Sequence, residues 1–432
     1  MKVFAIVSWV TGITWLLYGV TQNEFTQIFV AFITAFLGYF LICNNLRFKL
    51  RDLLILAILI RLISIGSFPA LSDDIYRFVW DGEVFHYGMN PYEHRPAEIA
   101  DHIGRSDLYE EMNSRNYYTV YPVVNQAVFI LAALAGDHLK LAVIIIRLLI
   151  GLCEIGVIWL VLRWMNNFQI PQKEAAWYFL NPLLITETYG NLHFEIVMVL
   201  FILLTLFSVR SVLKSGLYFC LSASSKLLSL ILLPFLLLQF KKIDRWHLLA
   251  VVVSGILLMF SPIIIFHSGS GFFSSLNLYF RQFEFNASLY YIFRWLGYQY
   301  WGYNAIGSIG PTLAILSMTA ILMITFRYRN VPLKNWPFVF TLLFTTYFLF
   351  ATTVHPWYII TPLIFGVMAQ LRYVVLWSAL VVLSYHAYSN SEVSENSWII
   401  AIEYGILCAA IFIELYTRKK PEHHAGDPAQ IS

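Results

Sequence analysis

Long apolar stretches, separated by short polar segments, dominate the chain. A helix needs about 20 mainly apolar residues to cross a bilayer, and backbone groups in lipid must pair within their own segment. The pattern therefore predicts an all-α polytopic integral membrane protein with about 12–14 membrane segments. The clearest apolar stretches are residues 3–21, 26–43, 53–68, 141–162, 175–190, 192–209, 248–266, 303–326, 337–353, 357–371, 373–389 and 398–416.

Two further apolar stretches are too short for complete crossings. Residues 217–240 carry Lys226 near their middle, and we expect them to form a hairpin of two short helices. Residues 122–135 are predicted to form a re-entrant or interfacial helix that does not cross. The first stretch, residues 3–20, has no small-residue cleavage site, so it is expected to stay as a membrane helix rather than be removed as a signal peptide.

Charge gives this pattern an orientation. Basic residues in short loops favour the cytoplasm. With the N-terminus inside, eighteen of the 28 basic residues fall in inner segments and only seven in outer ones. We therefore expect both termini in the cytoplasm, with residues 69–120 and 268–302 outside. One transmembrane domain is expected over residues 1–417, followed by a disordered cytoplasmic tail, 418–432.

Composition supports the membrane assignment and excludes several functions. The chain is 59% hydrophobic and 12% charged, with a net charge of +3, whereas soluble domains are about a quarter charged. So small an excess of positive charge argues against a nucleic-acid partner. The absence of a glycine-rich phosphate loop argues against a nucleotide-sugar donor or an ATP-driven process. Four separated cysteines are expected to be buried thiols: Cys43, Cys153, Cys220 and Cys408.

The first predicted outer loop, residues 69–120, concentrates polar chemistry, with ten of the 25 acidic residues. Ser72 is a candidate N-cap for a short helix, on which Asp74, Arg77 and Asp81 would share one face. An acidic face at the membrane surface suits a polar substrate attached to a lipid. The spacing alone equally fits a structural role, because acidic residues in a first turn favour the helix dipole.

Several motifs in order resemble the GT-C superfamily of membrane glycosyltransferases, most closely bacterial polyprenol-phosphate-mannose-dependent mannosyltransferases. The resemblance covers residues 70 to 370. The motifs are Asp73-Asp74-Ile-Tyr-Arg77, Trp80-Asp81-Gly82, Gly88-Met-Asn90-Pro91-Tyr92, Tyr121-Pro122-Val-Val-Asn125-Gln126, Asn181-Pro182 followed by Glu187, Gly190-Asn191 and His193, then Ser225-Lys226-Leu227, Glu284-Phe285-Asn286 and His355-Pro356-Trp357-Tyr358.

The resemblance implies a GT-C helical bundle in a bacterial inner membrane, with a catalytic first outer loop and an inverting transfer without a cofactor or metal. A sugar, mannose by resemblance, would move from a polyprenyl-phosphate donor to a lipid, glycan or protein acceptor. An outer-loop aspartate would act as general base, which is typically worth about 10²–10⁴-fold in rate. The family pattern places that base on Asp74, and a shift of one residue would place it on Asp73.

Further residues are expected to bind the substrates. Lys226, Arg281 and Arg294 are candidates for the donor phosphate, although Lys226 would also fit as a lysine reaching toward the inner surface. Glu187, Asn191, His193 and Glu195 are expected to position a sugar. A metal site at His193 and Glu195 is not favoured, because no His or Cys pairing supports it. The full substrate-binding set comprises Arg77, Asp81, Tyr92, Tyr121, Asn125, Glu187, Asn191, His193, Asn286, His355 and Tyr358.

Two other functions remain open from the sequence. A transporter or lipid flippase would use the intramembrane residues Lys226, Arg147 and Glu154 as a polar path. Arg147 and Glu154 lie seven residues apart on one face of the same predicted helix, where they could pair with each other. Transporters often show paired repeats and interrupted helices at matching positions, and the sequence shows only one interrupted hairpin. A polysaccharide polymerase would also use lipid carriers, with a different arrangement of loops.

Overall fold

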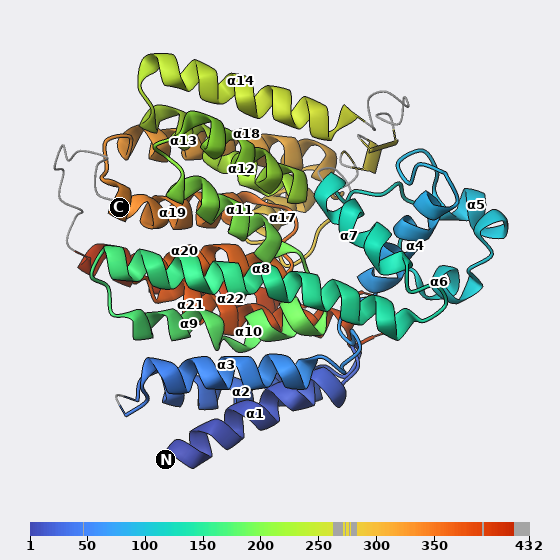
Figure 1. Ribbon diagram of the computed structural model, residues 1–432, viewed down its shortest axis with the longest axis horizontal. Coiled ribbons are helices and arrows are strands. Elements are labelled where there is room, and N and C mark those ends of the chain that lie inside the picture. The colour runs from blue at the N-terminus through green and yellow to red at the C-terminus, as the bar shows by residue number, and fades with distance from the viewer. Residues whose placement is uncertain are drawn as a thin grey trace.

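The structure is a computed structural model that describes residues 1–45, 47–261, 271–272, 274–275, 277, 283–390 and 393–418. Within these residues it is built almost entirely from helices, and the pairing of Phe285 with Thr353 is an isolated bridge. Most of the helices run roughly along one direction, and α4 to α6 form a lobe at one end (Figure 1). The predicted all-α class is confirmed.

The N-terminal half places three long helices before the lobe and one very long helix after it. In order the α-helices are α1 (Lys2–Tyr18), α2 (Phe25–Cys43), α3 (Leu50–Ser64), α4 (Asp74–His86), α5 (Pro96–Ile103), α6 (Ser106–Glu111), α7 (Val123–Ala133), α8 (Leu139–Asn167), α9 (Ala176–Phe179), α10 (Pro182–Ile185) and α11 (Glu195–Phe207). The short 3-10 helix η1 (Gln172–Ala175) precedes α9, and the π-helix η2 (Thr186–Gly190) follows α10.

The C-terminal half contains more interrupted segments. Its α-helices are α12 (Val212–Ser225), α13 (Leu233–Gln239), α14 (Lys242–Met259), α17 (Leu289–Trp301), α18 (Ile306–Arg327), α19 (Trp336–Phe350), α20 (Ile360–Met368), α21 (Tyr373–Leu380) and α22 (Ser397–Thr417). Between them lie the 3-10 helices η3 (Leu227–Leu232), η4 (Leu333–Asn335), η5 (Pro356–Ile359) and η6 (Val381–Tyr388).

By length and composition, four helices of the described part are long and apolar enough to cross a membrane: α2, α8, α18 and α22. A fifth span is possible if the pair 182–190 and 195–207, bent by 110°, counts as one. Shorter apolar helices include α1, α7, η3 with α13, η5 with α20, and α21 with η6. The predicted 12–14 segments therefore include many that are short or broken rather than continuous helices of spanning length.

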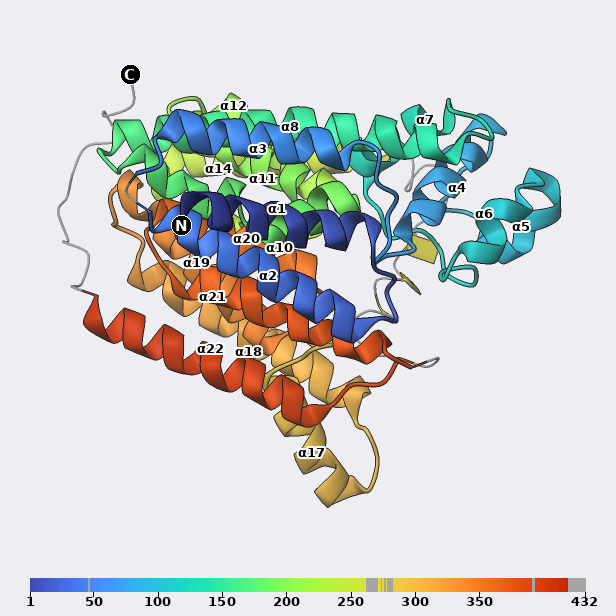
Figure 2. The same ribbon diagram turned by 90° about the horizontal axis from the view of Figure 1, so that it is seen from below.

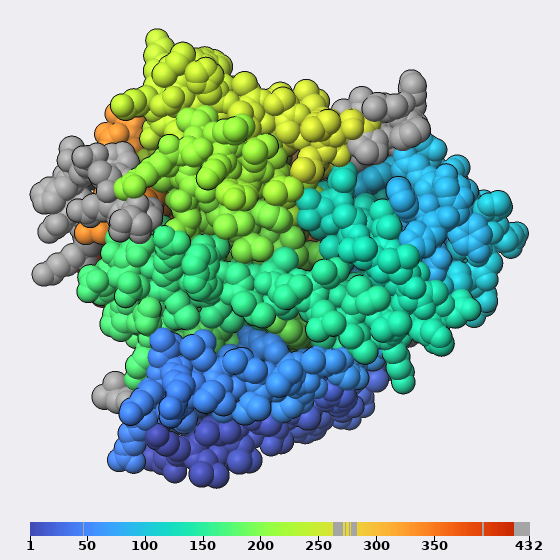
Figure 3. Space-filling view, in the orientation of Figure 1, coloured from blue at the N-terminus to red at the C-terminus, as the bar shows by residue number. Residues whose placement is uncertain are grey.

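The two ends of the bundle differ in character. We call the end that carries α4 to α7 the α4 end; α1 begins and α22 ends at the opposite end (Figure 2). The lobe formed by residues 69–120 projects from the α4 end in the space-filling view (Figure 3). Because α3 ends and α8 begins at the α4 end, the intervening helix α7 does not cross the bundle, as the sequence predicted.

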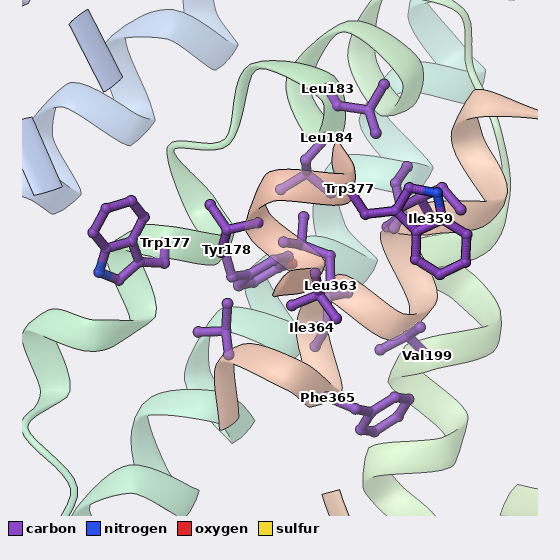
Figure 4. Close-up of a cluster of buried hydrophobic side chains, with 14 of the residues drawn as sticks. Trp177, Tyr178, Leu183, Leu184, Val199, Ile359, Leu363, Ile364, Phe365 and Trp377 are labelled. Carbon is purple, nitrogen blue, oxygen red and sulfur yellow. The ribbon is translucent and has the colours of Figure 1, made fainter. Parts of the chain in front are cut away.

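The main core is a large apolar cluster in the centre of the bundle. Figure 4 shows part of it, where side chains from α9, α10, α11, α20 and α21 meet around Tyr178 and Trp377. Both of these side chains are fully buried. Lipid tails are as apolar as these side chains, so close packing rather than escape from water stabilises contacts of this kind in a membrane.

A second apolar cluster attaches the lobe to the bundle. It joins α4, α6, α7 and α8, and Phe78 stacks on Phe129 with ring centroids 4.6 Å apart. Gly82 of α4 lies directly against the backbone of α7, where an added Cβ would sit 2.2 Å from the Phe129 carbonyl oxygen. This close approach fixes α4, and with it the first residues of that helix.

Buried charges inside the bundle form a network that differs from the sequence prediction. Arg61 of α3 contacts Glu154 of α8 through two hydrogen bonds, 2.6 and 3.1 Å long. Arg147 instead donates to the carbonyl oxygens of Tyr189 and Ile65, each at 2.7 Å. The expected Arg147–Glu154 pair is therefore wrong: Glu154 already has a cationic partner from another helix, and Arg147 is bound by backbone oxygens.

The cysteines are all free thiols, as expected, but they are not all buried. Cys220 is buried, Cys43 and Cys153 are intermediate, and Cys408 is exposed on α22. A lipid-facing helix surface is as apolar as a protein core, so an apolar sequence context does not distinguish the two positions.

Candidate active site

The candidate site is built around a break between two helices at the α4 end. The chain passes from α10 into one π-helical turn, η2, and turns by 110° before α11 begins. Leu192, within the break, has a φ of 65°, which is unusual for a bulky residue. Irregular backbone of this kind occurs at membrane depth only where protein buries it, and π-turns are frequent at functional sites.

The break presents a buried carboxylate and a histidine side by side. Glu187 is fully buried, and its Oε2 accepts a hydrogen bond from Asn191 Nδ2 at 3.1 Å. His193 Nδ1 lies 2.9 Å from the same oxygen. The hydroxyl of Tyr385, from η6, donates to the other carboxylate oxygen of Glu187. Each oxygen of this buried acid therefore has a polar partner, as buried charge requires.

Asp74 approaches this cluster from the lobe. It is the first residue of α4, and its Oδ2 lies 3.6 Å from His193 Nε2. The Asp74 side chain keeps 23% of its surface exposed, so it stands between the buried cluster and open space. Helix α4 begins one residue later than the predicted Ser72 cap would place it: Asp73 is the N-cap, and Ser72 Oγ accepts from the Asp74 backbone N–H at 3.3 Å.

The two neighbouring aspartates differ in electrostatics. Burial by itself raises the pKa of Asp74. The contact with His193 and the charge of His193 lower this pKa, and His355 and the Tyr121 hydroxyl lower it as well. These effects outweigh burial, so the net shift is downward. Asp73 has its pKa raised by burial and by the negative charges of Asp74 and Glu111. Asp74 is thus the carboxylate that protein contacts hold in its ionised form.

A stack of four rings extends from His193 across the site. Trp357 stacks on His193 with centroids 3.7 Å apart, and His355 stacks on Trp357 at 4.4 Å with an interplanar angle of 3°. Phe285 stacks in turn on His355, with ring centroids 4.9 Å apart. The His355-Pro356-Trp357 segment thereby reaches the residues of the break, although more than 150 positions separate them in the sequence.

Lys226 belongs to the same region. It lies at the junction of α12 and η3, where it pairs with Glu195, the first residue of α11. Its Nζ also lies 4.1 Å from the centre of the Tyr358 ring. The predicted hairpin is present, and Lys226 contacts groups next to the break rather than reaching toward the basic end. His193 and Glu195, two positions apart in the sequence, contact different partners: Asp74 and Glu187 for His193, Lys226 for Glu195.

Arg77 and Asp81, also predicted to bind substrate, are buried in the lobe and engaged with protein groups. Arg77 Nε donates to Asp81 Oδ1 at 2.7 Å, and its Nη1 donates to the carbonyl oxygens of Ser114 and Tyr117. Gln126 of α7 donates to the other Asp81 oxygen at 2.9 Å. These contacts hold residues 114–117 of the loop, and Gln126 of α7, against α4. In the observed geometry Arg77 and Asp81 therefore support the fold of the lobe.

Three other predicted residues line the connection between lobe and bundle. The Tyr92 hydroxyl donates to the Tyr121 carbonyl oxygen at 2.7 Å. The Tyr121 ring packs edge-on against Phe78 and Phe129. Asn125 is 4% exposed on α7, and its Oδ1 has no hydrogen-bond partner among the residues that the structure describes. Of these, Tyr121 is the one that influences Asp74 directly.

The remaining candidates are dispersed. Arg294 of α17 pairs with Glu284 at 2.5 Å, and Asn286 is bound by residues near the start of α22. Arg281 lies outside the described residues. The structure therefore brings together Asp74, Glu187, Asn191, His193, His355, Tyr358 and Lys226 from the predicted set.

Sequence reasoning missed two participants in this arrangement. Trp357 lies in the His355-Pro356-Trp357-Tyr358 motif, between the two selected residues His355 and Tyr358, so its position was an available signal. Glu195 was expected in the sugar-positioning cluster, but its pairing with Lys226 was not predicted. Tyr385 had no local signal, because it lies 198 positions from its partner Glu187 within an ordinary apolar segment.

Comparison with known proteins identifies the class. The chain matches the model of a glycosyltransferase family described as alpha-(1->6)-mannopyranosyltransferase, N-terminal domain (MptA_B family). The match covers residues 5–242, more than half of the chain, and the protein belongs to this family. It is therefore a mannosyltransferase-family membrane protein, and the suspected GT-C mannosyltransferase resemblance is confirmed. A search of curated proteins finds no match.

Proposed function

We propose that this protein transfers mannose from a polyprenyl-phosphate donor to a lipid, glycan or protein acceptor at the outer face of the membrane, with Asp74 as general base. The observation that carries the proposal is the position of Asp74, partly exposed at the start of α4 and 3.6 Å from His193 in the break between η2 and α11. The family supports mannose as the sugar.

The chemistry follows from the contacts of Asp74. Its lowered pKa keeps the carboxylate ionised at neutral pH, so it is able to accept the proton of an acceptor hydroxyl. The acceptor oxygen then forms a bond to the anomeric carbon of mannose while the bond from that carbon to the phosphate oxygen breaks. Attack opposite the leaving group inverts the anomeric configuration, and polyprenyl phosphate departs with the bonding electron pair.

The leaving phosphate gains negative charge, and among the lysines and arginines that the structure describes we assign Lys226 to bind it. Its side chain is 27% exposed and neutralised by Glu195, which sits two residues from His193. Charged donors aimed at a developing anion stabilise the transition state most in a site that excludes water. Arg294, on α17, is paired with Glu284, so we assign it a less direct part in binding the phosphate.

The contacts of the intramembrane charges favour transfer over transport. A polar pathway for a solute would link Lys226, Arg147 and Glu154. Instead Lys226 pairs with Glu195, Arg147 binds backbone carbonyl oxygens, and Glu154 pairs with Arg61. Lys226 and Glu154 are thus paired with different residues, and Arg147 donates to backbone oxygens, so these contacts do not join the three charges into one path.

The proposal is tested with purified protein, polyprenyl-phosphate mannose and lipid, glycan and peptide acceptors. We expect Asp74→Asn to lower kcat by about 10²–10⁴-fold, the usual contribution of a general base. Asp73→Asn should retain most of the activity. Asp101→Asn, an exposed acid on α5 of the same lobe, is the matched control.

Two results would count against the proposal at different levels. Full transfer by Asp74→Asn would remove the base assignment, and loss of transfer in Asp73→Asn alone would give that role to the neighbouring acid. If the wild-type protein consumes no polyprenyl-phosphate sugar with any acceptor while a solute crosses vesicle membranes, the donor class and the transfer reaction are both wrong.

A further inference from the structure

A buried acid in α22 stands outside the reaction described above. Glu403 is fully buried in a predominantly apolar helix, and its Oε1 accepts a hydrogen bond from Asn286 Nδ2 at 3.2 Å. Ionisable residues within membrane helices are costly and usually have a functional or organising role. The location of its partner shows what that role is.

Asn286 is held at three points by the C-terminal part of the chain. Its backbone N–H donates to Glu395 Oε1 at 2.5 Å, its side chain donates to Glu403, and its carbonyl oxygen accepts from the Tyr404 hydroxyl at 2.7 Å. Its φ of 45° lies in the left-handed region, where asparagine is better tolerated than most residues. The side chain is fully buried. These contacts leave little freedom to the residue before it.

That preceding residue is Phe285, the last ring of the stack that leads to the candidate base. Its backbone N–H donates to the Thr352 carbonyl oxygen at 3.0 Å, and its own carbonyl oxygen accepts from Val354 N at 2.8 Å. Its ring stacks on His355. The order of contacts is therefore Glu403, Asn286, Phe285 and His355, followed by Trp357, His193 and Asp74.

We propose that Glu403, Asn286 and Tyr404 form a clamp that sets the ring stack and thereby holds His193 against Asp74. Glu403 and Asn286 are then positioning residues for the transfer reaction, an inference that rests on the proposed role of Asp74. Each ring in the stack contacts the next face to face, so a displacement of Phe285 shifts the support of His355 and then of Trp357. A misplacement of about 1 Å in a catalytic group costs about 10²-fold in rate.

Steady-state kinetics of clamp variants test this proposal. Glu403→Leu removes the acceptor for Asn286, while Glu403→Gln retains an oxygen that accepts the same hydrogen bond. Asn286→Gly keeps the left-handed backbone and deletes the side-chain contact. Ile402→Ala, at the preceding position of α22, where the residue is 55% exposed, is the matched control.

We expect Glu403→Leu and Asn286→Gly each to lower kcat by about tenfold or more, while donor and acceptor KM stay within about twofold, because the effect is on orientation rather than binding. The double variant should be no worse than either single one, since both break the same contact. Glu403→Gln should retain most of the activity, and Ile402→Ala should match the wild type. A loss of thermal stability with unchanged kcat in both single variants would show a purely structural role and overturn the proposal.

A second readout does not depend on turnover. The ring-proton signals of His193, assigned by their loss in His193→Asn, are shifted by the stacked Trp357 ring and report the stack in the substrate-free protein. They should move in Glu403→Leu and Asn286→Gly but remain in place in Glu403→Gln. Unmoved signals in both disruptive variants overturn the clamp, even if wild-type transfer is confirmed. Failure of the wild type to use the donor rejects the proposed function instead, and the His193 signals still test the clamp.

Discussion

At the scale of single residues, the candidate site depends on His193 lying between two carboxylates. Glu187 holds one ring nitrogen at 2.9 Å, and the other faces Asp74 at 3.6 Å. Glu187 has lost all contact with solvent, whereas Asp74 is still partly exposed. The buried acid therefore orients the histidine, and the histidine holds the exposed acid in its ionised form.

The pH dependence of transfer should report this contact. Activity that needs an ionised Asp74 falls as the pH drops through the pKa of Asp74, and that pKa is lowered by His193. In His193→Gln the raising effect of burial remains while the favourable charge is gone, so the acidic limb of kcat/KM should move to higher pH. Asp73, His355 and Tyr121 also face Asp74 and stay unchanged in this variant.

The measurement is a pH–rate profile of kcat/KM for wild type, His193→Gln and an exposed-histidine control, His138→Gln. The control should leave the acidic limb where it is in the wild type. An acidic limb in His193→Gln that stays put, or moves to lower pH, would mean that His193 does not set the ionisation of Asp74.

The sequence could predict the individual acids and bases of this site better than their partners. Asp74, Glu187, His193 and Lys226 were all selected from motifs or from their position in apolar segments. The partners of these residues could not be predicted from the sequence. Tyr385 contacts Glu187, and Trp357 contacts His193, only because segments far apart in the sequence pack together. Arg77 and Asp81 show the reverse case: their spacing was interpreted correctly as a shared helix face, but the face turns inward to Gln126 and the loop backbone.

At the scale of elements, the position of Asp74 depends on how closely α4 packs on α7. Gly82 allows this approach, because any larger residue would place its Cβ 2.2 Å from the Phe129 carbonyl oxygen and 2.7 Å from the carbonyl carbon. These are backbone atoms, so the helices themselves must separate to accommodate a side chain. Such a shift would tilt the helix whose first residue is Asp74.

We therefore expect Gly82→Ala to destabilise the protein by about 1–3 kcal/mol, the usual cost of overpacking, and to lower kcat as α4 moves. Thermal unfolding in detergent and transfer kinetics measure the two effects. Gly405→Ala in α22 is the control, since a Cβ there meets nothing within 4 Å and alanine favours a helix by up to about 1 kcal/mol. Equal stability of Gly82→Ala and wild type would show that the α4–α7 contact is not tight.

Element types were predicted more successfully than their continuity. Apolar length located the helices, and the shortness of residues 122–135 and 217–240 correctly marked α7 and the α12–η3 junction as exceptions. The 110° turn at residues 186–194 was expected only as a loop between two spans. Its π-turn and the left-handed Leu192 depend on tertiary contacts of Glu187 and Asn191, which composition and periodicity do not encode.

At the scale of the whole molecule, charge separates the two ends of the bundle. At the end opposite α4, Lys2 donates to the Arg47 carbonyl oxygen at 2.8 Å, and Arg418 donates to the Ala369 carbonyl oxygen. Arg372 pairs there with Glu174. Loops that are far apart in sequence, each predicted to lie inside, thus gather at one end, while the acidic lobe stands at the other. A single rule, basic loops inside, therefore gives one consistent orientation for the entire fold.

This orientation predicts which engineered cysteines a membrane-impermeant maleimide will reach. In a background with Cys43, Cys153, Cys220 and Cys408 replaced by serine, Asp101→Cys lies on the exposed surface of the lobe, and Arg329→Cys lies on the exposed turn after α18. We expect position 101 to react in intact cells and position 329 only after permeabilisation, because the bilayer separates the two. Labelling of position 329 in intact cells would place the basic loops outside. It would also place Asp74 in the cytoplasm, where a donor presented in the outer leaflet could not reach it, so the same experiment constrains the side on which the sugar is transferred.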